Sequence, residues 1–189
     1  NTIAEKAQTG GHLTNTLVFA MEGDSTTEAQ MLQPVYSDLL LTKKNILLLR
    51  YSHRMFGNRK NIYIWWSKPE NGQLMVILSY ILLCQKAWKD AQVTICYVPD
   101  ERQGSEQEWY LKTLVENSRF RIGSLRFNKI ATEAGTSIYE TIRNKSEQAD
   151  LLFLGLSEEI DIVEYMDKWK GISTDIVFLR SNGEADLLA

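Results

Sequence analysis

Apolar residues in this chain fall into short runs that are separated by longer stretches of mixed polarity. The short runs, rich in Val, Ile, Leu and aromatic residues, predict β-strands over 15–21, 45–51, 61–67, 92–98, 121–127, 150–156 and 175–180. The stretches between them predict helices over 26–43, 73–89, 105–117, 136–145 and 157–170, with a loop over 67–72. Alternation of this kind is typical of βαβ units around a mostly parallel sheet.

We therefore predict an α/β fold with one or two mostly parallel sheets and helices on both faces. A polar, basic segment with a Gly-Asn turn interrupts the pattern after the second strand. We place a connector at residues 53–60, between a first lobe at 1–52 and a second lobe at 61–189. Both lobes repeat the βαβ theme, so they are interpreted as related units.

One predicted helix is apolar on nearly every face. Its segment Leu74 to Leu83, LMVILSYILL, is half the length that a membrane-spanning helix needs. A helix of this kind must be covered on more than one side, by a second layer of the same chain or by a second subunit. In the later helix at 105–117, Trp109, Leu111 and Leu114 are the expected buried residues.

Polar residues at helix starts predict several N-caps. The candidates are Ser25 or Thr26, Ser105 in a capping box with Glu108, Thr136 or Ser137, and Ser157. Pro34 is expected as a kink in the first helix or as its true first turn.

Composition narrows the possible functions. The chain has 189 residues, 44% hydrophobic and 24% charged, which is enough for a buried core. A formal net charge of −3 argues against sequence-independent nucleic-acid binding. Cys84 and Cys96 both lie in apolar runs without metal-site spacing, so each is interpreted as a small buried residue in a reducing compartment.

No pattern for catalysis or cofactor binding is present in the sequence. Glycine-rich nucleotide loops and a G-x-S-x-G elbow are missing. The only two histidines, His12 and His53, offer few ligands for a metal site. The turns at 21–28 and 155–159 carry carboxylates that would repel a phosphate. The AGTS turn at 134–137 is the remaining candidate, because its small residues could expose backbone amides to an anion, but an ordinary loop is the favoured interpretation. We expect no enzyme, no cofactor and no catalytic or metal-binding residue.

Two sequence features leave alternatives open. His53, Arg54, Arg59 and Lys60 form a cationic cluster for which a solvated connector is the favoured interpretation, with weak contact to a membrane surface as the other. Adjacent strand residues point to opposite faces, so at least one of the tryptophans in the pair at 65–66 is expected in the core.

The segment from Asn61 to Val98 resembles the carboxy-terminal domain of cation-chloride cotransporters. In that family a strand rich in Ile, Val and Trp leads into a leucine-rich helix that ends in a W-K-D-like turn. Further similar blocks are TNTLVFAM from Thr14, the N-K-S turn and the end of the chain; the matching residues are Trp88, Lys89, Asp90, Asn144, Lys145, Ser146, Leu179, Arg180, Ser181 and Asn182. The short segment at 127–136 is similar to a compact prokaryotic member.

The resemblance implies a regulatory and homodimerisation domain, similar to universal stress proteins, on the cytoplasmic face of the cell membrane. An attached transmembrane domain would carry out sodium- or potassium-coupled chloride symport. It also implies that 1–13 ends a helix and that the first lobe is incomplete at its amino terminus. A universal-stress-like nucleotide-binding module remains the alternative, because that architecture often holds ATP at strand ends.

Overall fold

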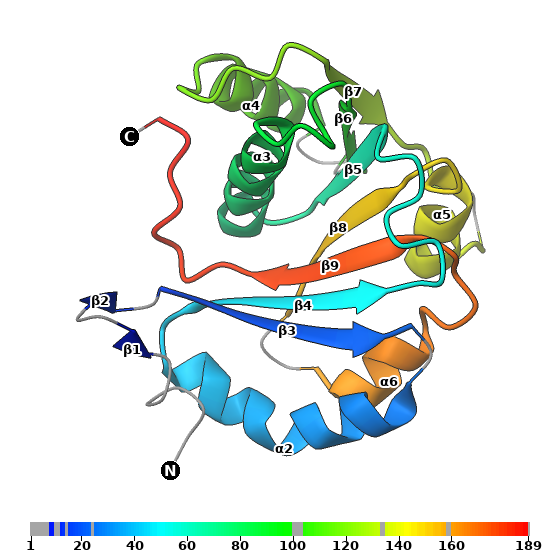
Figure 1. Ribbon diagram of the computed structural model, residues 1–189. Coiled ribbons are helices and arrows are strands. Elements are labelled where there is room, and N and C mark those ends of the chain that lie inside the picture. The colour runs from blue at the N-terminus through cyan, green and yellow to red at the C-terminus, as the bar shows by residue number, and fades with distance from the viewer. Residues whose placement is uncertain are drawn as a thin grey trace.

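The computed structural model describes residues 8–9, 12–13, 15–23, 25–99, 104–132, 135–157 and 160–188 (Figure 1). The strands are β1 Gln8–Thr9, β2 His12–Leu13, β3 Thr16–Glu22, β4 Asn45–Tyr51, β5 Asn61–Trp66, β6 Gln92–Tyr97, β7 Leu125–Lys129, β8 Leu151–Gly155 and β9 Asp175–Arg180. The helices are α2 Thr26–Leu41, α3 Pro69–Leu83, α4 Gly104–Glu116, α5 Ile138–Lys145 and α6 Ile162–Asp167.

A single seven-stranded sheet, in the order β3-β4-β9-β8-β5-β6-β7, organises these elements. All neighbouring strands in it run parallel except β4 and β9, which pair antiparallel with Leu48 opposite Phe178. The predicted class, a mostly parallel sheet with helices on both faces, is confirmed. Strands from the predicted first and second lobes join at the β4–β9 pair and share this sheet.

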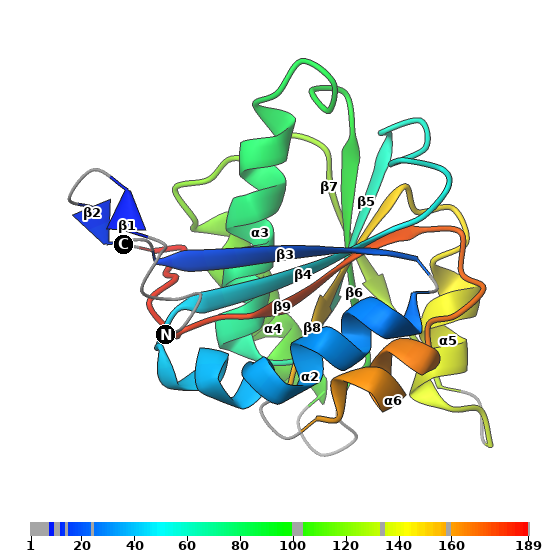
Figure 2. The same ribbon diagram turned by 60° about the horizontal axis from the view of Figure 1, so that its bottom comes forward.

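Two similar units meet at the antiparallel pair. On one side β3, α2 and β4 form a parallel strand–helix–strand unit, and on the other side β8, α6 and β9 form another. Helices α2 and α6 pack side by side on the same face (Figure 2). The units run in opposite directions, which is the arrangement that an approximate twofold axis between β4 and β9 would give.

Each face of the sheet has its own core. Side chains of α2, α5 and α6 cover one face together with Trp65, whereas α3 and α4 cover the other with Trp66. Both tryptophans are less than one-tenth exposed. Adjacent residues of β5 thus enter opposite cores, as the alternation of side chains along a strand requires.

Helix α3 begins earlier and ends earlier than predicted. The predicted loop at 67–72 is wrong from residue 69 onward, because Pro69 starts the helix, where a proline loses no helical hydrogen bond. Gly72 is inside α3 and leaves room for the Trp66 ring, which lies directly against it. At the other end the helix stops at Leu83, and turns lead to the buried Trp88.

Several smaller expectations also changed. Helix α6 is shorter than predicted and is capped by Asp161, which accepts a hydrogen bond from the Glu164 N–H at 2.8 Å, so Ser157 is not its N-cap. Trp109 is exposed, whereas Leu111 and Leu114 are buried as predicted. Strand β7 spans Leu125–Lys129, so it begins and ends later than the strand predicted at 121–127.

The predicted caps of α2 and α5 are confirmed at Ser25 and Ser137, the latter in a capping box with Glu140. Pro34 lies inside α2 on its exposed side. The capping box expected at Ser105 lies outside the side chains that the structure describes. The expectation that 1–13 ends a helix is wrong for residues 8–9 and 12–13, because these form the antiparallel strands β1 and β2, and the other residues of that range lie outside the described segments. No helix among the described residues has the length and apolar character needed to cross a membrane.

Replacing Gly72 with alanine should destabilise the fold despite the better helix propensity of alanine. A methyl group there would overlap the six-membered ring of Trp66, and overpacking of a core typically costs about 1–3 kcal/mol. Gly123→Ala is the matched control, because a Cβ at Gly123 meets no atom within 4 Å. Urea unfolding of both variants measures the difference; equal stability of the two would contradict the packing argument.

The two cysteines should differ sharply in reactivity. Cys96 is fully buried, as predicted, and its burial raises the pKa of the thiol to about 12. Cys84 is exposed, so the prediction that it is buried is wrong. A thiol reagent should therefore modify one cysteine in the native protein and two after unfolding, and Cys84→Ser should abolish the native reaction.

Candidate functional site

The connector between β4 and β5 has an unusual backbone. Four of its residues have positive φ: Met55 at 46°, Phe56 at 67°, Gly57 at 49° and Arg59 at 56°. Only one of them is glycine, and each of the others carries a steric cost of about 1–2 kcal/mol in the left-handed region. A backbone of this kind persists only where surrounding contacts hold it.

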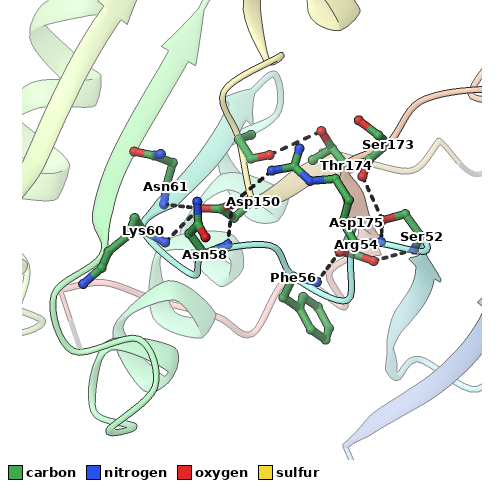
Figure 3. A network of polar contacts seen from close by, with 11 residues as sticks. Ser52, Arg54, Phe56, Asn58, Lys60, Asn61, Asp150, Ser173, Thr174 and Asp175 are labelled. Carbon is green, nitrogen blue, oxygen red and sulfur yellow. Dashed lines mark hydrogen bonds and ion pairs between the residues drawn. The ribbon is translucent and has the colours of Figure 1, made fainter.

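Two buried carboxylates hold the connector in this shape (Figure 3). Asp175, the first residue of β9, accepts hydrogen bonds from the backbone N–H groups of Ser52 and Phe56, both at 2.5 Å. Asp150, immediately before β8, accepts from the backbone N–H groups of Asn58 at 3.0 Å, Lys60 at 2.8 Å and Asn61 at 3.0 Å. The connector therefore crosses the amino ends of β9 and β8 and bonds to one aspartate at each.

The predicted cationic cluster lies on this connector. His53, Arg54, Arg59 and Lys60 are all exposed. Arg54 lies 3.5 Å from the Asp150 carboxylate, which is 3% exposed, and Lys60 forms a surface ion pair with Asp90 at 3.5 Å. The sequence pointed to the basic residues but not to the two aspartates that shape the loop, because each lies about 90 or more positions away in the chain.

A second turn lies against the connector. The Phe56 ring makes an edge contact with the Trp88 ring, with centroids 6.0 Å apart. Trp88 belongs to the turn after α3, where Lys86 and Lys89 are exposed. The resulting surface, residues 53–60 with 86–90, is called the basic edge below.

A different site, an aromatic pocket of about 570 Å³, lies at the carboxyl ends of β5, β6 and β8. Ligands of α/β proteins commonly bind at such strand ends. The pocket is walled by α5 and α6; its lining includes Trp65, Trp66, Ser67, Val98, Tyr139, Leu154, Gly155, Ser157, Asp161, Glu164, Tyr165, Lys168 and Trp169. The sequence did not indicate this pocket, because its walls come from four separate segments.

Electrostatics in the pocket favour positive over negative groups. The Lys168 ammonium is 3.2 Å from the Glu164 carboxylate and 5.0 Å from the Tyr139 ring centroid, and its hydrogen bond to Glu164 raises the pKa of Lys168. Burial raises the pKa of the Tyr165 hydroxyl, so this group stays neutral. A phosphate here would meet the carboxylates of Asp161 and Glu164.

Two of the three turns considered for anion binding supply helix caps, at Ser25 and Ser137. Ser25 accepts a hydrogen bond from the Glu28 N–H at 3.4 Å, and the Glu28 carboxylate accepts one from the Glu22 N–H. In the 134–137 turn, the Ser137 N–H donates to the Glu140 carboxylate at 3.1 Å. Among the described residues, no group of three or more His, Cys, Asp or Glu could hold a metal ion.

Most of the apolar helix α3 is covered by its own chain. Leu74, Met75 and Val76 are buried against the sheet. On another side lies the end of the chain, where the fully buried Leu187 donates its backbone N–H to the Gln73 side chain at 3.0 Å. The sequence left open whether α3 is covered by its own chain or by a second subunit, and for these residues the cover is the chain itself.

Removing either buried carboxylate charge should destabilise the protein. In Asp175→Asn or Asp150→Asn the new amide cannot accept from every N–H that faces it, so we expect a loss of about 2–4 kcal/mol. Asp90→Asn, in an exposed ion pair, should change stability by less than about 1 kcal/mol. Chemical denaturation measures all three variants, and a small effect at Asp175 would show that the connector does not depend on it.

Comparisons with known proteins support the fold but do not assign the chain to a family. No family model and no curated protein matches the chain. The crystal structure of the cytoplasmic domain of a prokaryotic cation chloride cotransporter is similar at a TM-score of 0.72 and 17% identity, over 98% of this chain and 71% of that one. A universal stress protein from Archaeoglobus fulgidus DSM 4304 is similar at a TM-score of 0.52 and 10% identity, over 85% of this chain and 59% of that one. The chain thus has the fold of both proteins, and the resemblance found in the sequence is confirmed at that level.

Proposed function

We propose that this chain is a cytoplasmic regulatory and assembly domain of a cation-chloride cotransporter. The observation that carries the proposal is the likeness to the cytoplasmic domain of such a transporter over 98% of the chain. Ordered sequence blocks support it independently, above all the strand, apolar helix and W-K-D turn from Asn61 onward. Cation-coupled chloride transport would belong to an attached membrane domain.

The proposal includes no chemical step in this domain. Its contribution would be mechanical: two copies associate, and movement of the pair shifts the attached transport domain between conformations. The outward side of α3 is the surface we assign to this contact. Ile81 is about half exposed there, and Ile77, four residues earlier on the same side, is half-buried.

Sedimentation equilibrium over a wide concentration range, with and without ATP, tests this function first. We expect a dimer whose dissociation constant ATP does not change, because carboxylates line the strand-end pocket where a nucleotide would be expected. A monomer that ATP stabilises or dimerises would overturn the assembly role and favour the universal-stress-like nucleotide-binding module.

One pair of variants locates the contact. Ile81→Asp should give folded monomers, since a desolvated carboxylate would weaken association strongly. Met31→Asp is the matched control, because Met31 is also exposed but lies on α2, which covers the opposite face of the sheet. If both variants remain dimeric, the contact lies elsewhere on the molecule.

A further inference from the structure

We propose that the basic edge, residues 53–60 with 86–90, docks onto a bilayer surface containing anionic phospholipids. The proposal uses the proposed function for one point only, which is that the domain lies close to a membrane. The surface itself is argued from its rigidity, its charge and its exposed large apolar side chain, Met55.

Rigidity is the first argument. The connector is tied to the sheet by five backbone hydrogen bonds to Asp150 and Asp175, and its Phe56 ring rests on Trp88. Its basic side chains therefore project from a fixed platform, so little backbone freedom is lost on docking. A loop that served only as a solvated link would gain nothing from three non-glycine residues with positive φ.

The charge of the edge is the second argument. Exposed basic side chains come from both segments, namely Arg54, Arg59, Lys60, Lys86 and Lys89, with His53 beside them. Arg54 and Lys60 have carboxylate partners, whereas none of the described carboxylates lies within ion-pair distance of Arg59 or Lys89. The local excess of positive charge contrasts with the net charge of −3 for the whole chain.

An exposed methionine makes lipid the favoured partner. Met55 is 59% exposed and stands among the basic residues of the connector. An apolar side chain surrounded by cations matches a membrane interface, where it enters the headgroup region while the cations pair with phosphates and carboxylates. An acidic protein segment would use the charges and gain little from the methionine.

Cosedimentation with vesicles tests the proposal. The full chain is mixed with vesicles of phosphatidylcholine alone or of phosphatidylcholine with phosphatidylserine, at rising salt. We expect binding only to the anionic vesicles and its loss at high salt. Arg59→Glu should lower the partition coefficient by roughly ten-fold or more, since each basic residue near such a surface contributes about five-fold.

Two further variants separate this site from general charge effects. Lys68→Glu makes the same change of charge at an exposed residue at the other end of β5, and it should bind like the unmodified chain. Met55→Ser keeps the charge and should bind anionic vesicles several-fold more weakly. Circular dichroism confirms that each variant is folded.

Several outcomes would overturn the proposal. These are no binding to anionic vesicles, equal losses in Arg59→Glu and Lys68→Glu, or binding to soluble polyglutamate without binding to vesicles, which would assign the edge to an acidic protein. The same variants are examined by sedimentation equilibrium. If the unmodified chain is a dimer but does not bind anionic vesicles, only the docking proposal is wrong. If the unmodified chain is a monomer, the proposed assembly function is wrong, and the vesicle experiment still decides the docking proposal by itself.

Discussion

The antiparallel pairing of β4 with β9 is the constraint from which the rest of the structure follows. Since β5 runs parallel to β9, the chain leaving β4 emerges at the edge of the sheet where β5 begins. No crossover helix is needed, and the connector has only to pass β9 and β8, a distance of about 14 Å at the usual spacing of strands. Aspartates at the amino ends of these two strands bind it on the way.

This pairing also separates two kinds of surface. The carboxyl ends of β5, β6 and β8 meet at one edge of the sheet, where aromatic side chains and the carboxylates of Asp161 and Glu164 line a pocket. Their amino ends lie at the opposite edge, which the basic connector covers. Charge is therefore distributed unevenly along the strands, although the chain as a whole is only weakly acidic. A domain polarised in this way has a preferred orientation beside an anionic surface.

Buried charge gives the connector its shape and explains why it is not an ordinary linker. Asp175 is fully buried and Asp150 nearly so, and backbone N–H groups satisfy their oxygens. Charge-assisted hydrogen bonds of this kind can offset the steric cost of the positive φ angles. Fold, connector and basic edge are thus parts of one arrangement, because the two aspartates that bind the connector lie at the amino ends of two strands of the sheet.

The sequence by itself determined the fold class and the order of the longer elements. Apolar runs such as 45–51 and 175–180 are strands with the predicted bounds, and Ser25 and Ser137 cap the helices that they were expected to cap, because these features depend on residues close together in the chain. Only the tertiary structure decided the strand order, the antiparallel junction and the pocket. The contacts that decide them, such as Asp175 with Ser52 or Asp150 with Lys60, join residues far apart in the chain whose meeting depends on the packing of the whole sheet, which no local pattern encodes.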